Sequence, residues 1–138
     1  MRISARTQYA LRAAAELAAA SPGPLPAERI ALAQGIPRRF LDNILLQLRR
    51  AGLLRSQRGP EGGYWLARAP DQISLADIVR IVEGVPEGGD HGGFPGVAGP
   101  LAGVWDALRD HEQAMLSDVT LADIARATAG EAAQPRPS

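Results

Sequence analysis

The sequence predicts a mainly α-helical protein with one small β-hairpin. Apolar residues recur at helical spacing in several segments that proline and glycine delimit, and a glycine-rich turn separates two short apolar runs. The chain has 138 residues, of which 46% are hydrophobic and 22% charged, and it contains no long apolar run. This composition indicates a globular chain without a membrane span.

Charge is segregated along the chain although the net charge is zero. Residues 1–68 carry eleven arginines and four carboxylates, a net charge of +7, whereas residues 69–138 carry four arginines and eleven carboxylates, a net charge of −7. Such asymmetry predicts that the first half binds a polyanion. All fifteen basic residues are arginine, which suits phosphate and guanine. A GC-rich genome would also favour arginine, but it would not separate the charges.

The chain contains no cysteine. Disulfides, thiolate zinc sites and cysteine-held iron–sulfur clusters are therefore excluded, and we expect no cofactor. Arg12 and Glu16 interrupt what would have to be the apolar core of a secretory signal. We therefore expect a cytoplasmic protein.

A first helix is expected from Ser4, which can cap it, to about Ala20. The side of this helix that we expect to face the core carries Tyr9, Leu11, Ala14, Leu17 and Ala18.

Two further helices are delimited by proline and glycine. A short one begins near Pro26 and ends at Gly35, and a longer one is bounded by Pro37 and Gly52. Two helices joined by a tight turn that contains glycine form a helix-turn-helix unit.

The longer of these helices has an apolar side and a polar side. The apolar stripe, expected to lie in the core, comprises Phe40, Leu41, Ile44, Leu45 and Leu48. The polar residues fall in two neighbouring rows, Arg38, Asp42 and Arg49 in one and Arg39, Asn43, Gln47 and Arg50 in the other. Arginine suits guanine, asparagine and glutamine suit adenine, and aspartate accepts a hydrogen bond from cytosine. A solvated surface would be similar in composition, but the short helix and tight turn before it favour DNA.

The next segment predicts a β-hairpin. Strands are expected at Leu53–Gln57 and Tyr64–Ala67, joined by the turn Arg58–Gly63. The glycines of this turn do not have the spacing of a phosphate-binding loop. A helix-turn-helix followed by a hairpin is a winged helix, whose tip could bring Arg58 into a minor groove or against phosphates.

Four segments occur in the order "MRISARTQYALRAAAELA", "IPRRFLDNILLQLRRAGLLRSQRGPEGGYWLAR", "ISLADIVRIVEG" and "PLAGVWDALRDHEQAMLSDVTLADI". Together they resemble the Rrf-two family of bacterial transcription regulators, the type that includes IscR, NsrR and CymR. The resemblance covers nearly everything before about Gly130, and the "RG-x-x-GGY" wing is its most specific part. It implies a homodimeric repressor or activator that binds a pseudo-palindromic operator in double-stranded DNA, with repression the expected sign.

The resemblance also implies contacts with DNA. The polar side formed by Arg38, Arg39, Asp42 and Asn43 would face the major groove, and Arg58, followed by Gly59, would enter the minor groove. Four residues would lie near the DNA backbone, namely Arg2, Ser4, Arg6 and Tyr9. The wing tip departs from the family at Glu61, where glycine is commoner, so this carboxylate either pairs with Arg58 or weakens binding of the wing.

A second departure lies in the loop at residues 84–99, where sensing members of the family usually carry three cysteines. Here the loop has seven glycines and no cysteine, so ordinary cluster ligation is impossible. The protein would respond to a metabolite or a partner protein, or be unregulated. Although Glu87, Asp90 and His91 could be imagined as metal ligands, we expect a flexible, solvated loop without a metal.

A long helix is predicted from Pro100, with one broad apolar side that contains Leu101, Val104, Trp105, Leu108, His111, Met115 and Leu116. The first helix of the same chain could cover this side, but an isologous dimer explains its length and suits an operator with two half-sites. On this seam His111 could titrate near neutral pH or be held by a neighbour.

These predictions divide the chain into four parts. A winged helix-turn-helix domain spans residues 1–83, with its wing at 53–67, and the flexible loop spans 84–99. A dimerisation helix and a short terminal helix span 100–129, and a disordered tail spans 130–138.

The sequence fits two other classes of function less well than it fits DNA binding. The chain has two histidines and no recognisable nucleophile motif, so we expect no enzyme. A winged-helix adaptor that binds another protein would share the same core, but it would need neither the positive half nor the polar rows. The charge distribution therefore favours a DNA-binding regulator.

Overall fold

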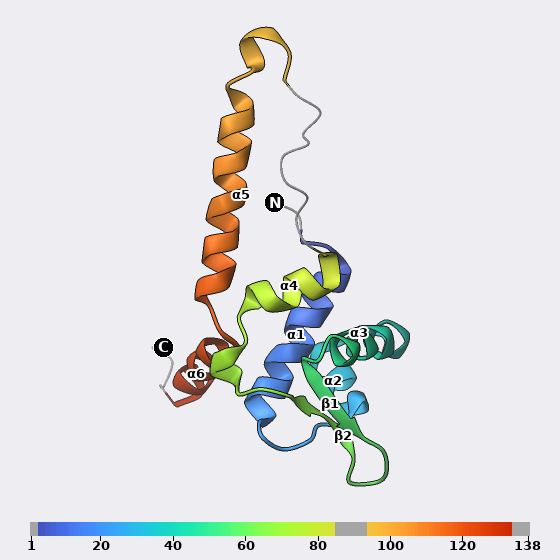
Figure 1. Cartoon of the computed structure of the whole chain (residues 1–138). Helices are drawn as coiled ribbons and strands as arrows, with labels where there is room; N and C mark the ends of the chain where they lie inside the picture. The colour runs from blue at the N-terminus through green and yellow to red at the C-terminus, as the bar shows by residue number, and fades with distance from the viewer. Residues whose placement is uncertain (1–2, 85–93, 134–138) are drawn as a thin grey trace.

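A computed structural model describes residues 3–84 and 94–133 (Figure 1). This part of the chain is mostly helical with one antiparallel hairpin, so the predicted fold class is confirmed. The elements are α1 (Ala5–Ala20), α2 (Ala27–Gln34), α3 (Arg38–Arg50), β1 (Leu54–Gln57), β2 (Gly63–Leu66), the 3-10 turn η1 (Pro70–Gln72), α4 (Leu75–Glu83), the 3-10 turn η2 (Gly96–Ala98), α5 (Leu101–Asp118) and α6 (Leu121–Ala133).

Helix α1 is the central element against which the others pack. Its cap is the predicted one, because Ser4 Oγ accepts a hydrogen bond from the backbone N–H of Thr7 at 3.1 Å. Its fully buried side is lined mainly by alanine, which allows α2, α3, α4 and α6 to approach closely. Tyr9 and Leu11, expected on this side, are only partly buried at its margins.

The turn between α2 and α3 follows the predicted helix-turn-helix pattern. Gly35 ends α2 with a φ of 61°, a left-handed conformation that favours glycine. Ile36 is buried in the turn, and α3 begins after Pro37. The turn thus anchors the start of α3 in the core.

The inner side of α3 is formed by Leu41, Ile44, Leu45 and Leu48, each with 0% exposure. The expectation that Phe40 belongs to this stripe is wrong, because its side chain is 53% exposed. Phe40 lies at the edge of the stripe, where its ring contacts the ring of Tyr9 at a centroid distance of 6.4 Å.

The hairpin is held to the helical core on one side. Leu54 pairs with Leu66 in register, and both side chains are buried. Two backbone hydrogen bonds of 2.9 Å join Leu25 and Tyr64, one in each direction, so β2 also pairs with the segment before α2. A Cβ at Gly63 would lie 2.7 Å from the Leu25 carbonyl oxygen, so this close approach requires glycine.

The two C-terminal helices differ in how they pack. Helix α5 has no buried residue and extends away from the other helices, whereas α6 returns to pack against α1 and η1 (Figure 1). Leu121, with 0% exposure, belongs to the same core as α1. Helix α6 also extends to Ala133, past the expected boundary at 129, and residues 134–138 lie outside the described part.

No helix among residues 3–84 and 94–133 is long and apolar enough to cross a membrane. Of the predicted loop at 84–99, residues 85–93 are not described, and the rest includes η2.

Two matching caps meet where α4 and α6 begin. Ser74 and Asp77 form a capping box at α4, and Thr120 and Asp123 exchange the same two hydrogen bonds at α6. Ser74 and Thr120 also face each other across an isolated antiparallel bridge. The backbone N–H of Thr120, which donates to Asp123 Oδ2 at 2.9 Å, lowers the pKa of Asp123, and its hydrogen-bonded neighbour Arg126 lowers it further.

The cap at α6 predicts a pH-dependent contribution to stability. Because the pKa of Asp123 is lower in the folded state than in the unfolded state, its stabilisation is complete above the unfolded value of about 3.9 and is lost as the pH falls through the folded value. We expect Asp123→Asn to lower the urea midpoint at pH 7 and to differ less from wild type at pH 3. The control is Asp71→Asn, an exposed position. Equal differences at both pH values would contradict this role.

Candidate nucleic-acid interface

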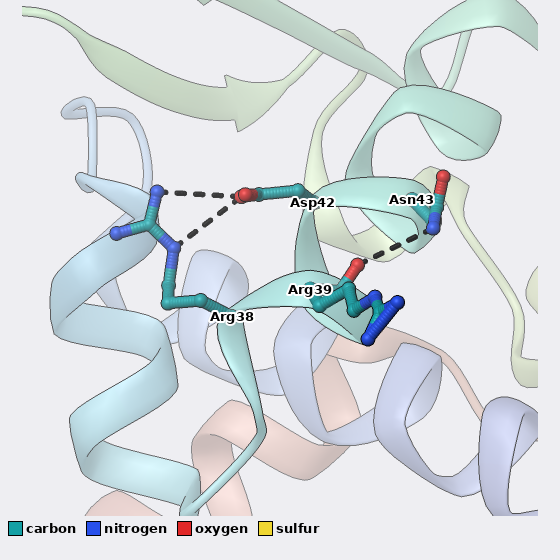
Figure 2. Close-up of polar contacts among 4 residues, drawn as sticks. All are labelled: Arg38, Arg39, Asp42 and Asn43. Carbon is teal, nitrogen blue, oxygen red and sulfur yellow. Dashed lines mark hydrogen bonds and ion pairs between the residues drawn. The ribbon is translucent and has the colours of Figure 1, made fainter.

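The outer side of α3 displays the four polar residues that were predicted to face the major groove (Figure 2). Arg38 and Asp42 form an ion pair of 3.3 Å across one helical turn, and both side chains are more than half exposed. Asn43 Nδ2 donates to the carbonyl oxygen of Arg39 at 3.3 Å. The exposed ion pair contributes little stability, so its groups can exchange partners at low cost.

Gln47 does not lie free on this exposed side. Its Oε1 accepts a hydrogen bond from Arg6 Nη2 at 2.6 Å, and its Nε2 donates to the carbonyl oxygen of Ile81 at 2.9 Å. The half-buried amide thereby joins α3 to α1 and α4. Both of its polar atoms are used within the fold, which separates Gln47 and Arg6 from the exposed Arg39, Asn43 and Arg50. Residue type alone could not distinguish these positions.

The start of α1 is joined to the end of α4. Ser4 Oγ lies 3.2 Å from Glu83 Oε1, and Thr7, with 0% exposure, donates to the same oxygen at 2.6 Å. Tyr9 lies nearby with the guanidinium of Arg12 5.4 Å from its ring centroid. Arg2 lies outside the described residues.

The wing turn presents an exposed arginine. Arg58 precedes Gly59, whose φ of 113° favours glycine, and both line a small hollow at the tip together with Glu61. In the part of the chain that the structure describes, Arg58 and Glu61 form no ion pair. Of the two alternatives for Glu61, pairing with Arg58 is therefore not observed.

Of the two arginines at the C-terminal end of α3, Arg49 contacts the hairpin. Arg49 Nη1 donates to Ser56 Oγ at 3.1 Å, which joins α3 to β1. Arg49 also lines a second hollow, distinct from the one at the wing tip, together with Arg55 and Trp65. The predicted interface included neither Arg55 nor Trp65. Arg55 and Trp65 are cross-strand partners, so their side chains lie on the same face of the hairpin. The alternation of side chains along the two predicted strands could have indicated this shared face.

Helix α5 leaves its predicted seam uncovered. Five apolar side chains are between 41% and 64% exposed, namely Leu101, Val104, Trp105, Leu108 and Met115. His111 is exposed as well, and Leu116 is partly buried. The alternative in which α1 covers this side is wrong.

The chain offers no thiolate donor for an iron–sulfur cluster. The chain has no cysteine, and the described residues contain no group of three or more histidines and carboxylates that could hold a metal ion. Glu87, Asp90 and His91 lie outside the described residues. The ligands of this chain therefore do not fit a thiolate-bound cluster.

Comparison with known proteins gives a consistent result. The Rrf2 family model, described as an iron-dependent transcriptional regulator, matches residues 3–127. One relative is an HTH-type transcriptional regulator, by its name, from Mycobacterium tuberculosis (strain ATCC 25618 / H37Rv). It is 44% identical to this chain over 131 residues, and the match covers 91% of this chain and 81% of the relative.

Two solved structures are similar to this chain over most of its length. CymR, the global cysteine regulator of B. subtilis, matches with a TM-score of 0.80 and 32% identity over 91% of this chain and 97% of that chain. T. potens IscR matches with a TM-score of 0.81 and 32% identity over 99% of this chain and 94% of that chain. The resemblance found in the four sequence segments is confirmed, and the chain belongs to the Rrf2 family of winged-helix, DNA-binding transcriptional regulators.

Proposed function

We propose that this protein represses transcription as a homodimer, with α3 in the major groove of each operator half-site and Arg58 in the adjacent minor groove. The observation that carries the proposal is the outer side of α3, where Arg39, Asn43 and Arg50 are exposed opposite a fully buried apolar side. An exposed polar helix face in a winged-helix regulator is suited to base reading.

The chemistry of this face favours direct reading of bases. The guanidinium of Arg39 can donate two hydrogen bonds to guanine, and the amide of Asn43 can pair with adenine. Asp42 can accept from the amino group of cytosine once the exposed pair with Arg38 rearranges. The bonds of Gln47 to Arg6 and Ile81 favour a structural role for that residue.

The wing adds contacts in the neighbouring groove. A lone guanidinium at the tip of a hairpin suits the negative potential of a narrow minor groove. The carboxylate of Glu61, in the same turn and without an ion pair to Arg58, would lie near phosphates and weaken binding. In this proposal, the guanidinium of Arg58 attracts the DNA and the carboxylate of Glu61 repels it.

The exposed side of α5 supports dimerisation. Leu101, Leu108 and Met115 recur every seven residues, with Val104 between them at coiled-coil spacing. The helix has 18 residues and is therefore about 27 Å long. Pairing this side with its copy would cover the apolar stripe and present two α3 helices to half-sites about one DNA turn apart.

The absence of thiolate ligands argues for regulation without a cysteine-bound cluster. The signal is then a metabolite or a partner protein, if the protein is regulated at all. The proposal assigns the chain no catalytic role and places it in the cytoplasm, with the chromosome.

Substitutions at α3 and at the wing should have different effects on DNA binding. We expect Asn43→Ala to relax base preference at one operator position by about 1 to 3 kcal/mol, because the amide pairs with a base edge. Arg58→Ala should instead weaken binding to all sequences. Selection from a random DNA library, followed by fluorescence anisotropy, measures both effects.

The control for these two variants is Arg126→Ala, an exposed residue of α6, which is a different helix from α3 (Figure 1). If Asn43→Ala and Arg58→Ala bind and select DNA like wild type, the proposed interface is wrong and a protein-binding adaptor is favoured.

Gln47 should affect stability rather than base preference. Gln47→Ala removes the bridge to Arg6 and Ile81, so we expect a loss of about 1 to 3 kcal/mol in the free energy of unfolding. Urea unfolding measures this loss, and Asn43→Ala, at an exposed site, should change stability by less than about 0.5 kcal/mol. A change in the selected operator with unchanged stability would show that Gln47 reads a base.

Charge on the α5 seam should dissociate the dimer. Val104→Asp puts a carboxylate in the paired stripe, so we expect monomers by sedimentation equilibrium and a loss of about 100-fold or more in affinity for an operator with two half-sites. Val97→Asp, at a fully exposed position of η2, should remain dimeric. A dimeric Val104→Asp variant would contradict an α5 interface.

A further inference from the structure

A positively charged hollow of about 550 Å³ lies between the C-terminal end of α3 and the hairpin. It is lined by Arg49, Leu54, Arg55, Ser56, Arg58 and Trp65. Half of these residues are arginines and none is a carboxylate. Three like charges around one open hollow create a positive potential that an anion would relieve.

The arginines are arranged for an external partner. Arg49 is held by its hydrogen bond to Ser56 at 3.1 Å, which uses one of its five N–H donors. Within the described residues, neither Arg55 nor Arg58 forms an ion pair or a side-chain hydrogen bond. The hollow is therefore lined by many guanidinium N–H donors and by no carboxylate that could accept their hydrogen bonds.

The remaining lining groups suit a phosphate. Guanidinium forks match pairs of phosphate oxygens. Among the residues that the structure describes, the indole N–H of Trp65 donates to no acceptor. Ser56 adds a hydroxyl that is already oriented by Arg49. The chemistry points to a phosphate oxyanion, which could belong to DNA or to a small phosphate-bearing molecule.

The position of the hollow favours DNA. One wall comes from α3, which the proposed function places in the major groove, and another includes Arg58, which it places in the minor groove. Neighbouring grooves are separated by a sugar–phosphate strand, so a surface between the two readers faces phosphates. We propose that this hollow is the seat of a DNA backbone phosphate, bound by Arg49 and Arg55; the proposal rests on the proposed function.

This phosphate seat assigns new roles to its residues. Arg49, which the sequence grouped with the base-reading rows, becomes a backbone contact, and Arg55 and Trp65 join the interface. Because phosphate contacts carry no sequence information, they should raise affinity and salt sensitivity without changing the preferred operator.

The test is the salt dependence of DNA binding by Arg55→Ala and by the double variant Arg49→Ala/Arg55→Ala. Anisotropy on a selected operator between about 50 and 200 mM salt gives the slope of log K against log salt. We expect this slope to become shallower by about 1 for the single variant and by about 1 to 2 for the double variant, with the selected sequence unchanged. Arg126→Ala should retain the wild-type slope.

Within the described residues, Arg55→Ala breaks no side-chain hydrogen bond, so this variant is informative even if loss of Arg49 disturbs the fold. A wild-type slope for Arg55→Ala, or an altered operator preference, would overturn the phosphate seat. If wild type itself binds DNA without salt dependence, the proposed function fails as well. A steep wild-type slope that is unchanged in Arg55→Ala would reject the phosphate seat alone.

The indole N–H signal of Trp65, one of two tryptophans, distinguishes the two sources of phosphate by nuclear magnetic resonance. We expect operator DNA to shift this signal and inorganic phosphate at equal phosphate concentration to leave it in place. A saturable shift with inorganic phosphate and none with DNA would identify a small-anion site and overturn the proposal.

Discussion

The complete burial of one side of α3 is the constraint on which the proposed DNA-binding surface depends. Leu41, Ile44, Leu45 and Leu48 together contribute roughly 6 to 12 kcal/mol, at about 1.5 to 3 kcal/mol for each buried side chain. This is comparable to the whole stability of a typical domain. Rotation of α3 about its axis would expose these side chains, so the orientation of its outer side is as stable as the fold itself.

The wing is anchored to the same core, so its distance from α3 is set by packing rather than by the bound DNA. Leu54 and Leu66 are buried beneath the hairpin, and Leu25 is joined to Tyr64 by two backbone hydrogen bonds. Arg49 adds a link from α3 to β1. A surface that is already arranged loses less conformational entropy on binding, which favours affinity.

The sequence predicts the helices, their caps and the hairpin because those features depend on neighbouring residues. Ser4, Gly35 and the wing glycines act through local hydrogen bonds and backbone angles, and they are found where the pattern places them. Phe40 and Gln47 lie at the margins of the apolar stripe, where contacts with other helices decide burial. The hollow lined by Arg49, Arg55 and Trp65 forms only because α3 lies beside the hairpin. The alternation of side chains along a strand does not predict which helix lies next to it.

Helix α4 connects α5, the proposed dimerisation helix, to α3, the proposed base-reading helix. A helix of 18 residues with none buried is marginal in water, so the proposed pairing with a partner would stabilise it. Helix α4 contacts both α5 and α3, and the carbonyl oxygen of Ile81 receives the amide of Gln47. A ligand can shift operator binding only by the difference in its affinity for two arrangements of the protein. Because α4 contacts both α5 and α3, a change in its position would affect the proposed dimer interface and the proposed base-reading surface together.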